Sequence, residues 1–143
     1  MNNKNQLLAK ILTYSGTLPF IGCVIVMLMH FSYVDAGFIA RAYGAVIISF
    51  LCGIHWAIYL FFSEKRLANL FIISNAITLI AWLSLIILPQ NISLLLQSFC
   101  FLYLLMLDIK LRDAGILPDW FYILRRNATV IVVFSLILIA YLS

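Results

Sequence analysis

The sequence predicts an all-α fold, an integral membrane helical bundle of five transmembrane helices that forms a single transmembrane domain over residues 1–143. Of its residues, 66% are hydrophobic and only 10% are charged, whereas soluble domains typically carry about 25% charged residues. A bilayer core about 30 Å thick is crossed by roughly 20 apolar residues in a helix. The chain divides into five such stretches, and the segments between them are too short to form an extramembrane domain.

The same composition excludes several other classes of protein. A chain this apolar is not disordered, and its three widely separated cysteines do not form the disulfide framework of a small secreted domain. The nine basic residues are too scattered to follow a phosphate backbone, so no nucleic-acid partner is expected. The partner that the composition implies directly is the lipid bilayer.

The five helices are expected at residues 7–31, 40–62, 67–88, 92–107 and 120–142. The first stretch is longer than the apolar core of a secretory signal, so we expect it to be retained as a helix. Pro19 lies within it and lacks a backbone N–H group, which predicts a kink. The carbonyl group freed near residue 15 then needs another donor, because lipid offers none.

The second helix has two different faces. At 100° per residue, one arc holds Arg41, His55 and Trp56, and the opposite arc holds bulky apolar residues. Beside the polar residues runs a column of small residues at every fourth position, formed by Ala45, Ser49, Gly53 and Ala57. Such a column allows two helix backbones to approach closely. We therefore expect the second helix to be central and to pack through this column.

Polar residues at matching depths define a candidate intramembrane site, because ionisable groups within a membrane often serve a function. Asn75 on the third helix lies near the expected depth of His55, and Gln97 on the fourth lies near that of Arg41. The candidate site therefore consists of Arg41, His55, Trp56, Asn75 and Gln97, with a hydrogen bond expected between Asn75 and His55. The alternative is that Arg41 reaches the interface and His55 is a neutral packing residue.

The connection before the fifth helix contains a helix stop and a new start. Gly115 is typical of a helix C-terminus and Pro118 of a first helical position. Asp108 at the end of the fourth helix has two possible partners: Arg112 one turn later, or Arg125 across the loop. The second pairing would clamp the fourth helix to the fifth.

The distribution of basic residues predicts the orientation in the membrane, because Lys and Arg beside short loops are retained in the cytoplasm. With five crossings, one side of the membrane receives eight basic residues and the other receives Arg41 alone. The eight are Lys4, Lys10, Lys65, Arg66, Lys110, Arg112, Arg125 and Arg126. We expect a cytoplasmic N-terminus and a C-terminus outside. The lack of an Arg- and Ser-rich transit segment favours a multi-pass protein of a bacterial inner membrane.

The sequence resembles a known family over nearly its whole length, most clearly in the second expected helix. The pattern formed by Arg41, 43–45, 48–51, Gly53 and 55–56 resembles the signature of the DUF3429 family, bacterial relatives of transmembrane protein 69. Further matching positions are Tyr14, Gly16, Pro19, Phe20, Trp82, Asp108, Gly115, Leu117, Pro118, Trp120 and Arg125. The chain departs from the pattern at Cys52, where Gly is expected, and at Phe121, where Tyr is expected. The resemblance implies a small multi-pass membrane protein without an assigned activity.

No catalytic constellation is evident in the sequence. The two histidines, His30 and His55, do not stand at a metal-ligand spacing, and no nucleotide-binding or nucleophile motif occurs. We therefore expect no metal, no cofactor and no enzymatic activity. The leading hypothesis is a non-enzymatic structural or accessory component of a membrane complex, with a membrane-protein partner or a second copy of itself. The alternative is a small-solute or proton-coupled carrier that uses Arg41 and His55.

Overall fold

The computed structural model describes residues 3–30, 33–62 and 68–143. Within these ranges the chain is helical, without strands, and five of its helical stretches are long and apolar enough to cross a membrane. The helices are α1 (Asn3–Ser15), α2 (Leu18–Leu28), α3 (Ala36–Phe62), α4 (Leu70–Ile87), α5 (Gln90–Asp113) and α6 (Asp119–Leu142). The predicted membrane-embedded all-α fold is confirmed.

The first expected helix is divided into α1 and α2 just before Pro19, which lies in the first turn of α2. The break is closed by hydrogen bonds from two side chains. The Thr17 hydroxyl donates to the carbonyl oxygen of Tyr14 at 2.7 Å, and the Tyr43 hydroxyl of α3 donates to that of Gly16 at 3.2 Å. Tyr43 of a neighbouring helix thus satisfies a carbonyl group at the break, one residue after Ser15, whose carbonyl would accept from residue 19 in a continuous helix. Lipid could not supply such a donor.

The remaining helices differ from expectation mainly at their ends. The second begins earlier, at Ala36, and the fifth agrees within one residue. Residue 31 of the expected first helix and residue 67 of the expected third lie outside the described residues. The expected end of the fourth helix at residue 107 is wrong, because α5 continues to Asp113. It stops before Gly115, which has a φ of 72° and donates its N–H to the Arg112 carbonyl oxygen at 2.8 Å.

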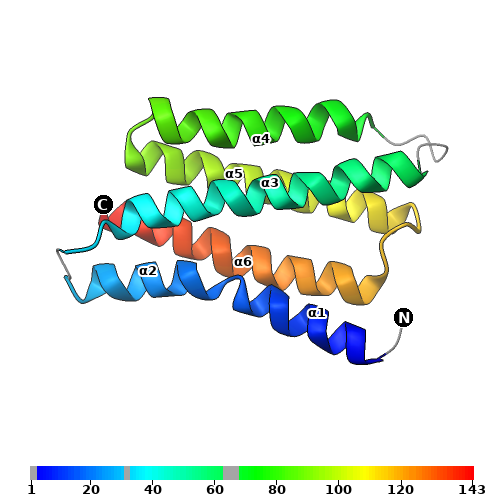
Figure 1. The fold of residues 1–143 in the computed structure, drawn as a ribbon, viewed down its shortest axis with the longest axis horizontal. Helices are drawn as coiled ribbons and strands as arrows, with labels where there is room; N and C mark the ends of the chain where they lie inside the picture. The colour runs from blue at the N-terminus through cyan, green and yellow to red at the C-terminus, as the bar shows by residue number, and fades with distance from the viewer. Residues whose placement is uncertain (1–2, 31–32, 63–67) are drawn as a thin grey trace.

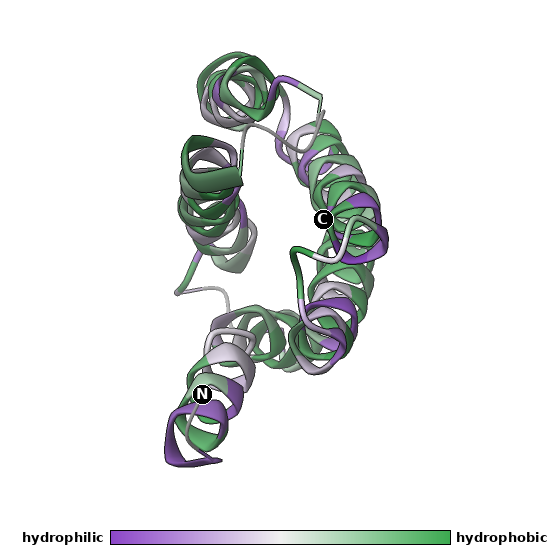
Figure 2. Ribbon diagram, turned by 90° about the vertical axis from the view of Figure 1, so that its right-hand side faces the viewer, coloured by the Kyte–Doolittle hydropathy of each residue, from purple (hydrophilic) through white to green (hydrophobic). Residues whose placement is uncertain are grey.

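The helices lie roughly along one direction, with α3 between α4 and the pair formed by α2 and α6 (Figure 1). In the view turned by 90°, the N-terminal part of α1 projects away from the other helices (Figure 2). α3 contacts α2, α4, α5 and α6. The expectation that this helix is central is therefore confirmed.

The interior of the bundle is closely packed and mostly apolar. Its large fully buried apolar side chains come from α2, α3, α5 and α6, and include Phe20, Ile48, Leu94, Leu104, Leu136 and Ile139, while α4 contributes the small side chains of Ser74, Ala81 and Ser84. By contrast, α1 has no fully buried residue. The helices other than α1 thus form the core, and α1 lies along its side.

Candidate functional site

The five residues of the expected polar site occupy three separate places. Gln97 donates its side-chain amide to the backbone oxygen of Arg41 at 2.8 Å, which agrees with their matching depths. Trp56 and Asn75 line one small cavity between α3 and α4. His55 belongs to a third group, with Asp108 and Arg125. The structure therefore does not assemble Arg41 and His55 into one site.

Arg41 acts on the end of a neighbouring helix. Its Nη1 lies 3.5 Å from the Leu85 carbonyl oxygen and 3.4 Å from that of Leu88, at the C-terminus of α4. The last carbonyl groups of a helix lack partners within it, and the helix dipole is negative there. Arg41 is thus placed to cap α4, with its guanidinium group also 5.4 Å from the Phe38 ring.

Gly44 provides the space that Gln97 occupies. A Cβ atom built on Gly44 would lie 2.3 Å from Oε1 of Gln97, closer than real atoms approach. Gln97 is fully buried, so its amide cannot move into solvent. The glycine therefore allows Gln97 to reach the backbone of α3, and this contact joins α3 to α5.

The expected hydrogen bond between Asn75 and His55 is wrong. Asn75 is exposed and donates to the Phe71 carbonyl oxygen of its own helix at 2.8 Å. His55 is buried, with 1% of its surface exposed. Its two ring nitrogens contact Leu51 and Asp108 instead. The two residues share a depth but lie on different sides of the interface between α3 and α4.

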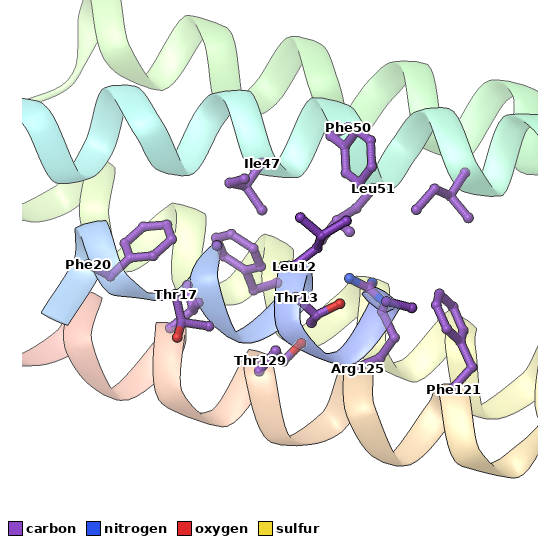
Figure 3. A pocket seen from close by; sticks show the side chains of 16 residues that line it. Leu12, Thr13, Thr17, Phe20, Ile47, Phe50, Leu51, Phe121, Arg125 and Thr129 are labelled. Atoms are coloured by element: carbon purple, nitrogen blue, oxygen red, sulfur yellow. The ribbon is translucent and has the colours of Figure 1, made fainter. Parts of the chain in front are cut away.

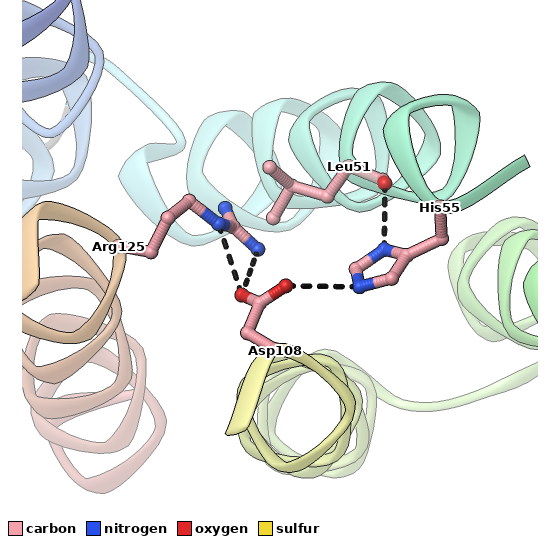
Figure 4. A network of polar contacts seen from close by, with 4 residues as sticks. All are labelled: Leu51, His55, Asp108 and Arg125. Atoms are coloured by element: carbon pink, nitrogen blue, oxygen red, sulfur yellow. Dashed lines mark hydrogen bonds and ion pairs between the residues drawn. The ribbon is translucent and has the colours of Figure 1, made fainter. Parts of the chain in front are cut away.

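The predicted clamp between Asp108 and Arg125 is present, and His55 extends it to a third helix (Figure 4). Nε and Nη2 of Arg125 lie 3.1 and 2.9 Å from Oδ2 of Asp108. Nε2 of His55 lies 2.9 Å from the other carboxylate oxygen, Oδ1. The three side chains are buried and come from α3, α5 and α6. We call them the charged triad.

The charged triad also includes a contact with the backbone. Nδ1 of His55 lies 2.9 Å from the Leu51 carbonyl oxygen, so the two ring nitrogens each face an oxygen atom. A neutral ring donates to one of these oxygens and a protonated ring to both. Arg125 is always protonated, so the triad brings a guanidinium cation into the bundle beside the Asp108 carboxyl group.

The triad lies inside the bundle. His55 is seven residues before the end of α3, Asp108 five before the end of α5, and Arg125 six after the start of α6. At 1.5 Å per residue these positions are about 11, 8 and 9 Å from the helix ends. The prediction missed the contact of His55 because it placed Asp108 at the very end of the fourth helix and considered only Arg112 and Arg125 as its partners. The helix continues to Asp113, so Asp108 lies inside the bundle. Its position on the same helical face as Gln97 was the signal that pointed to the interior.

The column of small residues lies mostly on the outside of the bundle, contrary to the expected packing. Ala45 is buried, but Ser49, Gly53 and Ala57 are exposed. A Cβ atom built on Gly53 would meet no atom within 4 Å. The buried side of α3 is formed by Gly44, Ile48, Leu51, Cys52 and His55 instead. Larger residues thus fill the bundle, and the column is left open.

Two cavities flank α3. One, of about 290 Å³, lies between α3 and α4 and is lined by Ser49, Cys52, Gly53, Trp56, Ser74, Asn75 and Thr78. The other, of about 360 Å³, is bounded by residues of α1, α3 and α6, together with Phe20 and Phe101. We call the first the small-residue groove and the second the apolar cavity. Arg125 lines the apolar cavity, whereas Arg41 and His55 line neither of the two.

Comparison with known proteins identifies the family of the chain. The family described as "Protein of unknown function (DUF3429)" matches residues 6–141. The chain belongs to the DUF3429 family. It is also similar to "Transmembrane protein 69" of Xenopus tropicalis, with 32% identity over 130 residues that cover 86% of this chain and 49% of the relative. The chain thus spans about half the length of this curated relative. No solved structure matches it significantly.

Several residues that carried the resemblance to the DUF3429 family lie in these polar contacts. Gly44 makes room for Gln97, and Arg41 reaches the end of α4. His55, Asp108 and Arg125 form the charged triad. Each of these side chains joins two or more helices, so the family pattern in this chain corresponds to contacts between helices.

Proposed function

We propose that this DUF3429 protein is a non-enzymatic component of a membrane complex, which receives a transmembrane helix of another membrane protein in the small-residue groove. The observation that carries this proposal is the open column on α3. Ser49, Gly53 and Ala57 are exposed although they are spaced for close packing of helices. Another helix could approach the backbone of α3 there without displacing any side chain of this bundle.

The polar side chains beside the small-residue groove favour a protein helix, and not lipid, as its occupant. Asn75 and Ser49 are exposed beside the groove, and Asn75 lies about 8 Å along α4 from Leu70, inside the span. Each donates to a carbonyl oxygen of its own helix, so its side-chain oxygen remains available as an acceptor. Polar side chains in lipid are favourable when they bond across helices. A partner helix would supply such bonds, which lipid chains lack.

The remaining intramembrane polar groups support a structural role as well. Arg41, Gln97 and the charged triad are each engaged with other helices of the same chain. The alternative function, a carrier using Arg41 and His55, would need both residues to line a shared path. Neither lines either of the two cavities described here, so that alternative has less support.

Co-purification from native membranes tests the proposal, with Gly53→Leu as the disrupting variant. Gly22→Leu on α2 is the matched control, because a Cβ at either glycine meets no atom within 4 Å. We expect Gly53→Leu to reduce the recovered partner at least tenfold and Gly22→Leu to leave it unchanged, with equal melting temperatures. Equal recovery with both variants would contradict the proposal. Recovery of a differently tagged second copy in place of another protein would assign the groove to a homo-oligomer.

We also propose that the end of the bundle that holds the charged triad faces the cytoplasm, in a bacterial inner membrane. Among the described basic residues, Lys4, Lys10, Lys110 and Arg112 lie at this end, and Arg41 lies near the other. A C-terminal alkaline phosphatase fusion should be active, and a C-terminal green fluorescent protein fusion should be dark. The reverse pair of signals would overturn this orientation.

A further inference from the structure

The apolar cavity combines an apolar wall with one buried cation. Its lining is mostly aliphatic and aromatic, and includes Phe20, Phe50, Phe101 and Phe121. Figure 3 shows Arg125 reaching into it from α6, with Leu12 and Thr13 of α1 across from it. At about 360 Å³ the cavity is within the range of sites that bind small molecules, roughly 300–1,000 Å³. It lies on the opposite side of α3 from the small-residue groove.

Arg125 has donors left over for a ligand. Its Nε and Nη2 both point to Oδ2 of Asp108. Among the residues that the structure describes, none is a hydrogen-bond partner of Nη1. Nη1 is not one of the fully buried atoms without a partner, so it retains accessible surface although only 8% of Arg125 is exposed. A guanidinium group offers five N–H donors, and the two on Nη1 are suited to an oxygen of an anion.

The electrostatics around Arg125 leave room for an anion on its Nη1 side. Among the described acidic residues, only Asp108 contacts Arg125, and it does so through Nε and Nη2. Asp113, the nearest in sequence, is paired with Arg112 at 2.9 Å. An anion beside Nη1 would form charge-assisted hydrogen bonds with the guanidinium group.

The shape of the cavity indicates what else the anion carries. On α6 the lining runs from Phe121 to Val132, a length of about 16 Å along the helix. Arg125 lies towards one end of this length, and the lining beyond it towards Phe20 and Val132 is mostly apolar, with the threonine side chains of Thr17 and Thr129 among it. A compact anionic group attached to a single aliphatic chain fits this distribution, with the chain lying along the helices.

We propose that the apolar cavity binds a long-chain fatty carboxylate, with its carboxylate at Arg125 and its chain towards Phe20 and Val132. A carboxylate oxygen can accept the N–H groups of Nη1, and a single chain matches the volume and the mostly apolar lining of the cavity. A two-chain phospholipid is a poorer match, because its bulky head group would have to enter the interior. The site is separate from the small-residue groove, so this inference does not depend on the proposed partner.

The test measures binding of oleate to the full chain in a non-ionic detergent, by native mass spectrometry and by the shift in melting temperature. Oleyl alcohol provides the same chain without charge, and butyrate provides the carboxylate without the chain. We expect oleate to bind at least tenfold more tightly than either. Equal binding of oleyl alcohol would overturn the role of Arg125. Equal binding of phosphatidylglycerol would overturn the assignment to a fatty carboxylate.

Two variants locate the site. Ala9→Phe fills the cavity from α1, which has no fully buried residue, so the core stays intact. Its matched control is Ala76→Phe on the exposed side of α4. We expect oleate binding to fall at least tenfold with Ala9→Phe and to remain with Ala76→Phe. Unchanged binding in Ala9→Phe would contradict the proposal.

Arg125→Lys retains a cation for Asp108 but removes the two N–H donors of Nη1. With the fold verified by circular dichroism, we expect at least a tenfold loss of oleate binding and little change for oleyl alcohol. Equal oleate binding by Arg125→Lys and the wild type would contradict the proposal. Gly53→Leu should leave oleate binding unchanged, which separates a failure of this inference from a failure of the proposed partner helix.

Discussion

The two ends of the bundle each hold an arginine at a similar depth but accommodate it differently. Arg41 lies five residues from the start of α3, and Arg125 six from the start of α6, or about 8 and 9 Å. Arg41 is half-buried and reaches backbone carbonyls at 3.4–3.5 Å. Arg125 is buried and reaches a carboxylate at 2.9 Å. The dipoles of backbone carbonyls are a sufficient partner for a cation that can approach the membrane–water interface. A cation inside the bundle needs a counter-charge.

This difference indicates which residues contribute most to the stability of the bundle. At the Arg41 end, a single neutral amide, Gln97, joins α5 to α3. At the other end, one carboxylate is shared between α3 and α6. We therefore expect the triad end to depend strongly on one residue, Asp108, and the Arg41 end to lose stability in smaller steps.

The largest effect is expected from Asp108→Ala. The change removes the acceptor of both His55 and Arg125 and leaves a buried cation without its partner. Breaking a buried ion pair in this way typically costs about 3–5 kcal/mol. The free energy of unfolding in mixed detergent micelles would show this loss, and a failure to fold would be its extreme form.

Asp113→Ala is the matched control for that prediction. Asp113 pairs with Arg112 on the same helix, and 61% of its side chain is exposed. An exposed ion pair contributes little to stability, so Asp113→Ala should leave the unfolding curve nearly unchanged. A similar loss with both substitutions would mean that the burial of Asp108 is not what makes its contacts important.

A smaller effect is expected from Gly44→Ala at the Arg41 end. The added Cβ would lie 2.3 Å from Oε1 of Gln97 and would displace an amide that has no exposed surface. Loss of the hydrogen bond to Arg41 leaves buried polar groups unpaired, which costs about 1–3 kcal/mol. The same unfolding measurement tests this.

Two further variants show whether the collision is the cause. Gly53→Ala places the same methyl group where nothing lies within 4 Å, so it should be tolerated. In the double variant Gly44→Ala with Gln97→Ala, the second change removes the colliding amide. The double variant should therefore lose less free energy of unfolding than the sum of the losses in the two single variants. Strict additivity would show that Gly44 and Gln97 act independently.

The fold was predictable from the sequence to a large extent because lipid imposes simple constraints. Runs of apolar residues predicted five spans, and Pro19 predicted the break between α1 and α2. The end of α5 was not predictable from hydropathy, because the apolar run stops at Leu107 while the helix continues through charged residues. That one boundary concealed the contact between Asp108 and His55.

For the candidate site, the sequence predicted individual pairs of contacting residues but not how the pairs are arranged in the bundle. Depth identified Gln97 with Arg41. For Asp108 the sequence left two partners open, Arg112 and Arg125, and the structure shows the second. Periodicity shows which residues share a face but not whether that face is inside. Ser49 and Gly53 were therefore assigned to the interior, although the structure exposes them. Distinguishing an inner from an outer column of small residues needs the positions of the neighbouring helices.

The smallest effect is expected from Arg41→Met, which keeps an apolar chain of similar length and removes the charge. The lost interaction is with the C-terminal carbonyls of α4 at 3.4–3.5 Å. A cation at a helix C-terminus typically contributes about 0.3–1 kcal/mol, and the Gln97 bond is to the Arg41 backbone, so it should survive. Arg125→Met provides the comparison, because it leaves the Asp108 carboxylate without its arginine and should destabilise the bundle several times more. If both substitutions lower the free energy of unfolding equally, the two arginines have equivalent environments, and the proposed difference between the two ends is wrong.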